Sequence, residues 1–174
     1  MALTFELDPV VDQALRDEVL ALWTDVSNAG GAVGFVPPVT PDAVRPELDR
    51  RLTEIAEGRT RLLVGRDAHG TVAATAFLAY NQHRLMKHHL WLYVVMVHPA
   101  LQGQGQGRAL MATAEETART FDGIEALRLT CRGGTGADRF YAACGYKEVG
   151  RVPGAIRVAP GDDRDDVHMM LPLN

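Results

Sequence analysis

The sequence predicts an α/β fold in one domain, residues 1–174, with a mixed, mostly antiparallel sheet of six or seven strands flanked by about four helices. Two observations predict it. Strand-like and helix-like segments are interspersed along the whole chain, and no linker, internal repeat or low-complexity stretch divides it. A length of 174 residues suits one domain, and 47% hydrophobic against 23% charged residues supplies enough apolar side chain for a core.

The predicted elements follow from two periodicities. Period-2 alternation, or a short run of branched and aromatic residues, marks a strand, and apolar residues at i, i+3, i+4 and i+7 mark a helix. Turn signals separate the elements, such as Asn28-Ala-Gly-Gly after the first helix and Asp67-Ala-His-Gly within a hairpin. In chain order we expect a strand (3–7), two helices (11–26 and 41–57), three strands (61–66, 71–80 and 89–97), a helix (108–121), a strand (126–131), a short helix (137–144) and two strands (146–149 and 167–171).

Three segments depart from these simple patterns. Pro46 lies inside the second helix, and we expect it to open the main segment after a separate first turn, because proline disrupts a helix interior. Ala32–Val39 is an unusually apolar loop, which either packs on the core or forms a wall of a substrate pocket. Gly161–Asp166 is expected as a polar, solvated connection, because it lacks the ligand pattern of a calcium loop.

Composition excludes several classes of protein. The formal net charge of −4 offers no obvious source of phosphate affinity, so we expect no nucleic-acid partner. No apolar run approaches the roughly 20 residues of a membrane span, and the N-terminus has no basic start followed by an apolar core, so we expect no membrane partner and no signal peptide. Cys131 and Cys144 form no Cys-x-x-Cys pair. We therefore expect no metal site and two reduced, mostly buried thiols in a cytoplasmic protein.

The most informative stretch runs from Val95 to Arg108, Val-Met-Val-His-Pro-Ala-Leu-Gln-Gly-Gln-Gly-Gln-Gly-Arg. It predicts a strand, a tight turn and a helix that begins among glycines. A helix N-terminus has about four unpaired N–H groups and a partial positive charge. Gly103, Gly105 and Gly107 carry no Cβ, so a bulky anion can approach the backbone. The stretch is therefore predicted to hold a phosphate or pyrophosphate.

Comparison with known phosphate-binding motifs narrows the class of ligand that this stretch can hold. The chain has no Gly-x-x-x-x-Gly-Lys-Ser/Thr run, and the dinucleotide pattern Gly-x-Gly-x-x-Gly fails from both Gly103 and Gly105. The pattern Gln/Arg-x-x-Gly-x-Gly/Ala does match, as Gln102-Gly-Gln-Gly-Gln-Gly after a strand that ends in Val97-His-Pro. This segment resembles the acetyl-CoA motif of the GNAT superfamily of N-acetyltransferases.

The second half of the chain resembles the same superfamily. Its members carry a helix of the form Asn-x-x-Ala-x-x-Phe/Leu-Tyr that ends at Gly-Phe/Tyr. This chain agrees at five positions: Ala137, Phe140, Tyr141, Gly145 and Tyr146. Gly134 stands where the family has Asn, which puts one contact to the cofactor in doubt. The segment Gly30–Pro37 is also similar to the same region of tabtoxin-resistance-type acetyltransferases.

The resemblance implies acetyl-CoA as cosubstrate, a primary amine of a small molecule as acceptor, and direct attack of that amine on the thioester. The strand ending at Val97 would splay from its neighbour to admit the pantetheine arm, one of its N–H groups would polarise the thioester carbonyl, and amides of 103–108 would hold the pyrophosphate. Tyr141 matches the usual general acid, or it only packs against the cofactor sulfur. The implied cofactor-binding residues are Val95, Met96, Val97, Gln102, Gly103, Gln104, Gly105, Gln106, Gly107 and Arg108.

The general base stays open. His83, His88 and His89 cluster before the long strand, and His168 lies in the last strand just after Asp165 and Asp166, but water serves as well. A thiol nucleophile is not favoured, because neither cysteine has a histidine partner at a recognisable spacing.

Two other functions remain possible, together with one mode of assembly. Acetylation of a protein N-terminus or lysine predicts an open groove between the Phe35 loop and the His83 loop, whereas a small-molecule enzyme is closed there. A non-catalytic acetyl-CoA-binding module predicts no turnover. A homodimer is plausible, because the final strands can pair or exchange between chains.

Overall fold

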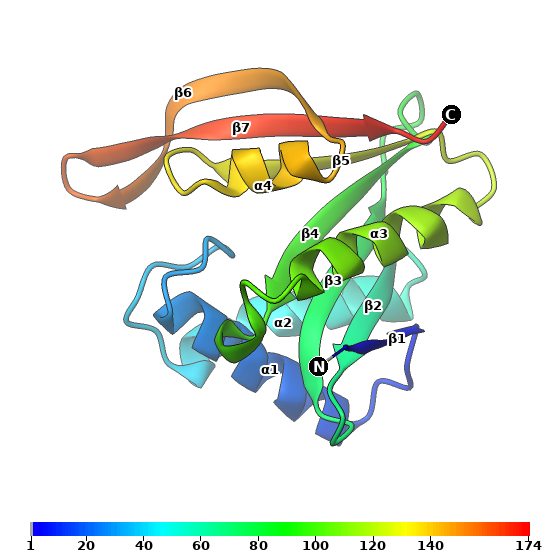
Figure 1. The fold of residues 1–174 in the computed structure, drawn as a ribbon, viewed down its shortest axis with the longest axis vertical. Helices are drawn as coiled ribbons and strands as arrows, with labels where there is room; N and C mark the ends of the chain where they lie inside the picture. Colours follow the sequence, from blue (N-terminus) through cyan, green and yellow to red (C-terminus); the bar gives the residue numbers. More distant parts are fainter. Residues whose placement is uncertain (1) are drawn as a thin grey trace.

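The computed structural model describes residues 2–174 and contains seven strands in one sheet (Figure 1). The element order is β1 (Thr4–Leu7), α1 (Gln13–Asn28), α2 (Pro41–Ala56), β2 (Thr60–Arg66), β3 (Val72–Tyr80), β4 (His89–Val97), α3 (Gln106–Arg119), β5 (Ala126–Arg132), α4 (Ala137–Ala143), β6 (Lys147–Ala159) and β7 (Asp162–Pro172). A 3₁₀ turn, Pro99–Leu101, follows β4. The order of strands and helices is the one that the sequence predicts.

The sheet is mixed and mostly antiparallel, as predicted. Its strand order is β1-β2-β3-β4-β5-β7-β6, and the β4–β5 pair is parallel while the other neighbours run antiparallel. Helices α1 and α2 cover one face of the N-terminal half, α3 covers the other, and α4 lies beside the C-terminal strands (Figure 1). The two faces bury separate apolar clusters, one around Trp23 and Phe77 and the other around Leu90 and Leu110.

Helices α1 and α2 begin at residues whose side chains cap them, whereas α3 and α4 begin at Gly105 and Gly136. Asp12 accepts a hydrogen bond from the amide of Leu15 at 2.8 Å, and Thr40 accepts one from the amide of Ala43 at 3.3 Å. Pro46 does not separate a first turn from the rest of α2, which runs unbroken from Pro41 to Ala56, so that prediction is wrong. Pro46 has no N–H to donate to the carbonyl of Asp42, so the helix loses one hydrogen bond there. Asp42 is exposed in the first turn, where water can bond its carbonyl instead.

The last hairpin is also longer than predicted. Gly161–Asp166 is not a solvated connection, because β6 and β7 continue through this segment to a two-residue turn at Pro160 and Gly161. Gly161 has φ of 78°, the value that the third position of a type II turn requires. Cross-strand pairs such as Arg157 with Asp163, Nε to Oδ1 at 2.7 Å, stabilise a strand whose residues have low intrinsic β propensity.

None of the helices in residues 2–174 is both long and apolar enough to cross a membrane.

Candidate active site

The central feature of the site is the divergence of β4 from β5. Their parallel pairing runs from His89 with Ala126 to Trp91 with Arg128 and, in the described chain, stops there. Beyond Trp91 the two strands open into a V (Figure 1). The splay predicted at the end of β4 is therefore present, and it leaves the backbone beyond Trp91 without a strand partner on the β5 side.

A β-bulge sets the direction of β4 within this V. The register between β3 and β4 shifts between Thr75 and Phe77, and Val94 opposite has φ of 50°, which is costly for a branched side chain. The buried Thr75 hydroxyl donates to the Val94 carbonyl at 2.9 Å and holds the irregular backbone in place. Residues 95–97 follow the bulge and line the cleft.

The start of α3 forms the opposite side of the cleft. Gly103 and Gly105 have φ of 74° and 83°, in the left-handed region, and a Cβ built on either meets nothing within 4 Å. Gly107 is required for a different reason: its Cβ would lie 3.1 Å from the Phe140 ring. The first two glycines therefore shape an open backbone at the helix N-terminus, and the third lets α3 approach α4.

Most of the predicted cofactor-binding residues meet in one cleft of about 570 Å³ between β4, the start of α3 and α4. Gln104 and Gln106 do not line it. The Gln104 side chain donates to the carbonyl of Ala100 at 2.9 Å, and the buried Gln106 accepts from the amide of Leu3 at 3.1 Å. Gln102 donates to the carbonyl of Val97 at 3.0 Å and so fixes the end of β4. The lining residues among those predicted are Val95, Met96, Val97, Gln102, Gly103, Gly105, Gly107 and Arg108.

Tyr141 lies on α4 where this cleft meets a second cavity. The second cavity has a volume of about 900 Å³, and the two share Val95, Thr130, Cys131 and Tyr141 in their linings. Burial raises the pKa of the Tyr141 phenol above its usual range, so the group is protonated at neutral pH. A phenol that keeps its proton therefore lies at the junction of the two cavities.

The second cavity is roofed by segments from both halves of the chain. The apolar loop 32–39 is one wall, anchored by the Trp23 indole, whose Nε1 donates to the carbonyl of Val33 at 2.8 Å. Arg132 on β5 donates to the carbonyl of Phe35 at 3.3 Å across the opening of the V. Ile156 on the β6–β7 hairpin also lines the cavity. The loop packs on the core through Phe35 and Val33, as expected, and it also lines a cavity.

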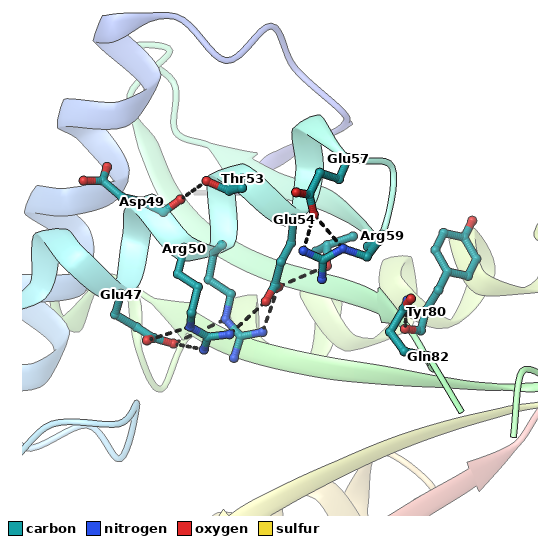
Figure 2. Close-up of polar contacts among 11 residues, drawn as sticks. Glu47, Asp49, Arg50, Thr53, Glu54, Glu57, Arg59, Tyr80 and Gln82 are labelled. Carbon is teal, nitrogen blue, oxygen red and sulfur yellow. Dashed lines mark hydrogen bonds and ion pairs between the residues drawn. The ribbon is translucent and has the colours of Figure 1, made fainter. Parts of the chain in front are cut away.

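Helix α2 supplies a polar wall that sequence reasoning missed. Figure 2 shows Arg50 between Glu47 and Glu54, and Arg50 ion-pairs with both carboxylates. Arg51 is buried, donates to Glu54 at 3.2 Å and lies over the Tyr93 ring, 4.2 Å from its centroid. Arginine and glutamate at spacings of three and four along an otherwise amphipathic helix were the available signal.

None of the four histidines that the sequence offers as bases lines either cavity in residues 2–174. His83 and His88 are exposed in the loop before β4, and neither they nor His89 line the two cavities. Burial, with His88 beside it, lowers the pKa of His89. His168 does not line the second cavity either, but its Nε2 is 3.2 Å from Oδ2 of Asp166, which does.

The two cysteines are free thiols. Cys131 lines both cavities, and burial, followed by the charges of Asp138 and Asp166, raises its pKa to about 11. The thiolate that a nucleophile needs is therefore scarce at neutral pH. Three of the aspartates between Asp162 and Asp166 pair with arginines, and residues 2–174 contain no cluster of metal-ligating side chains.

The chain belongs to the GNAT family of acetyltransferases, since the model of that family matches residues 14–146. This membership confirms the prediction of an N-acetyltransferase whose cosubstrate is acetyl-CoA.

Solved structures support the same fold. A phosphinothricin acetyltransferase from Sinorhizobium meliloti, in complex with acetyl-CoA, is similar with a TM-score of 0.77 and 18% identity over 99% of this chain and 89% of that chain. A ribosomal-protein-alanine N-acetyltransferase from Brucella melitensis has a TM-score of 0.75 and 20% identity over 97% of this chain and 99% of that chain. A GCN5-related N-acetyltransferase from Kribbella flavida has a TM-score of 0.74 and 23% identity over 97% of each chain. At these identities the likeness concerns the fold.

Proposed function

We propose that this chain transfers the acetyl group of acetyl-CoA to the primary amine of a small molecule by direct attack of the amine on the thioester. One observation carries the proposal: two cavities approach the gap between β4 and β5 and share Val95, Cys131 and Tyr141. A donor in the first cavity and an acceptor in the second can therefore meet without an intermediate on the protein, and the protonated Cys131 thiol is poorly suited to form one.

The residues present suit the donor. Backbone without a strand partner at 95–97 can pair with the extended pantetheine arm as an added strand would, and one of these amides can polarise the thioester carbonyl. The open N-terminus of α3, with Gly103 and Gly105 and with Arg108 in its first turn, suits the pyrophosphate. Gly134 does not line this cleft and has no side chain, so it cannot supply the contact that Asn makes in the family.

Tyr141 is the proposed general acid. When the C–S bond of the thioester breaks, the leaving thiolate takes the phenolic proton and the acetyl carbon keeps its new bond to the acceptor nitrogen. The amine loses one proton before it attacks, and the second proton, lost as the amide forms, restores the Tyr141 phenol. Each turnover therefore converts an ammonium and acetyl-CoA into an amide, free CoA and one proton.

A small acceptor is favoured by the roof of the second cavity, where Arg132 is bonded to the Phe35 carbonyl. The phosphinothricin acetyltransferase among the structural neighbours is named for a small amine substrate, which agrees with this choice. The likeness of Gly30–Pro37 to tabtoxin-resistance-type enzymes stays a prediction about the particular acceptor.

Acetylation of a protein is the second candidate, and one observation favours it. A smaller cavity of about 340 Å³ meets the acceptor cavity at Arg50, Arg51 and Tyr93 and reaches Asn81 and Gln82 before the His83 loop. Figure 2 shows Gln82 beside Tyr80, at the far end from Glu47. A peptide could extend along this path.

A mixed acceptor panel separates these candidates. Acetyl-CoA is incubated with the protein, a set of small primary amines and a set of peptides with free N-termini or lysines, and acetylated products are detected by mass spectrometry alongside free-thiol release. Acetylation of small amines alone supports the proposal, and acetylation of peptides alone supports the second candidate. Absence of acetyl transfer to any acceptor contradicts both.

We further propose a cytoplasmic location, a single domain spanning the chain, and a homodimer. The two free cysteines suit a reducing compartment. The long edge strand β6, with half-exposed Val149 and Val152, offers backbone groups for pairing with a second copy. Light scattering coupled to gel filtration tests the dimer, and a monomer at micromolar concentration contradicts it.

A further inference from the structure

Two carboxylates line the acceptor cavity within residues 2–174, Glu47 and Asp166. Glu47 is neutralised from two sides, because Arg50 ion-pairs with it and Nε of Arg51 is 3.5 Å from its Oε1. Asp166 has no arginine within ion-pairing distance in the described chain, and its Oδ2 instead lies 3.2 Å from Nε2 of His168. Asp166 is thus the cavity carboxylate that remains free for an ammonium ion.

The register of β7 makes Asp166 and His168 a pair. They are two residues apart on one strand, so their side chains point to the same face, while Val167 between them is fully buried on the other. Arg132 is the register partner of Asp166 on β5, but its guanidinium reaches across to the Phe35 carbonyl. His168 is 29% exposed and lies outside the cavity lining, which gives a proton a way from Asp166 to solvent.

The other titratable groups in the cavity hold their protons at neutral pH. Burial raises the pKa of the Tyr93 phenol, raises that of Tyr141 further, and raises that of the Cys131 thiol to about 11. The remaining charged groups that line the cavity are arginines and the paired Glu47, and His168 lies beside Asp166 on β7. The charged and titratable groups around Asp166 are Arg132 on β5, Arg157 on β6, His168 on β7, and Glu47, Arg50 and Arg51 on α2 across the cavity.

Building on the proposed function, we propose that Asp166 binds the acceptor ammonium and removes its proton, and that His168 relays this proton to solvent. Asp166 is then a catalytic residue and His168 a positioning and relay residue. The N–H bond of the ammonium breaks and its electron pair stays on nitrogen, an O–H bond forms at Asp166, and the proton passes to His168 and on to water. Once the proton has reached water, Asp166 and His168 are back in their starting state. The neutral amine then attacks the thioester.

The test compares D166N and H168Q with wild type in steady-state assays from pH 6 to pH 10, using the best acceptor of the amine panel. At pH 7 we expect D166N to lower kcat by ~100-fold, within the range for loss of a general base. The defect should shrink toward pH 10, because amine that is already neutral needs no base. H168Q, which keeps a polar side chain beside Asp166 but cannot take up and pass on a proton, should lower kcat several-fold with KM unchanged and steepen the pH profile.

Matched controls separate this role from damage to the fold. D165N makes the same change on the next residue of β7, whose carboxylate bonds Arg151 and the Gly154 amide instead, and H69Q makes the histidine change in the β2–β3 turn. Both should keep the wild-type pH profile. CoA affinity, measured by calorimetry, should be unchanged in D166N and H168Q, as it is governed by the other cavity.

The outcomes are distinguishable. A D166N defect that is equal at pH 7 and pH 10, or that appears in KM alone, overturns the base assignment while acetyl transfer itself stands. A wild-type protein that acetylates no amine contradicts the proposed function and, with it, the inference that rests on it. A pH-dependent kcat defect in D166N with intact CoA binding supports both.

Discussion

Replacing Gly105 with glutamate perturbs the proposed anion site at the start of α3 while leaving the fold largely intact. The position has φ of 83°, and a Cβ there meets nothing within 4 Å, so the substitution creates no clash. The left-handed backbone costs a side chain about 1–2 kcal/mol, and a carboxylate at a helix N-terminus returns about 0.3–1 kcal/mol. We expect the free energy of unfolding to fall by only about 1 kcal/mol.

The loss of CoA affinity should be much larger. A carboxylate about 5 Å from a phosphate charge, at an effective dielectric constant of about 20, costs about 3 kcal/mol. Since about 1.4 kcal/mol is a factor of ten in Kd, even one such repulsion, partly screened by salt, predicts a rise in Kd of ~100-fold. Isothermal titration calorimetry with CoA measures it directly.

A matched glycine supplies the control. Gly123 also has a left-handed φ, of 72°, with nothing within 4 Å of a Cβ, and it lies outside the cleft lining. Gly123→Glu should show a similar loss of stability from the strained backbone with CoA affinity unchanged. If Gly105→Glu binds CoA within threefold of the wild type, the diphosphate does not lie at the start of α3 and the reasoning fails.

Three further predictions concern single side chains. Tyr141→Phe should lower kcat by ~100-fold with the Kd for acetyl-CoA within threefold of wild type, and an unchanged kcat would remove Tyr141 from the mechanism. Tyr146→Phe should raise the free energy of unfolding by about 1 kcal/mol in urea titrations, because the buried Tyr146 hydroxyl has no hydrogen-bond partner in residues 2–174; a loss of stability would show that the hydroxyl is satisfied. Alkylation of Cys131 by iodoacetamide, followed by peptide mass spectrometry, should be slow at pH 8 and rise about tenfold per pH unit toward its pKa of about 11, and rapid labelling at pH 7 would contradict the raised pKa.

Local patterns predicted most of the fold because each element carries its own signal. The apolar spacing in α1 and the alternation in β1 depend on neighbouring residues, and both elements form within a few residues of the predicted ranges. The predicted strands of the β6–β7 hairpin are shorter than the observed ones, because aspartates and Pro153 disfavour a strand locally. Its stability comes from cross-strand pairs that sequence alone does not align, although Pro160-Gly161 was an available turn signal.

The candidate site also has parts that the local sequence predicts and parts that depend on long-range packing. The glycines before α3 could be predicted because their chemistry is local, whereas the Gly107 contact with Phe140 joins two helices that are distant in sequence. Asp166 and Arg51 reach the acceptor cavity only through the splay of β4 and β5 and through the packing of α2. Long-range geometry of this kind leaves no short motif, so the sequence offered Asp166 only as one of two acids just before His168.

A crystal structure of the protein with bound acetyl-CoA would show directly where the cofactor lies. We expect the diphosphate on the amides of residues 103–108, the pantetheine arm alongside residues 95–97, and the thioester at the junction lined by Tyr141. Density for the cofactor elsewhere, or a cleft between β4 and β5 that stays closed to it at saturating concentration, would refute this placement of the cofactor.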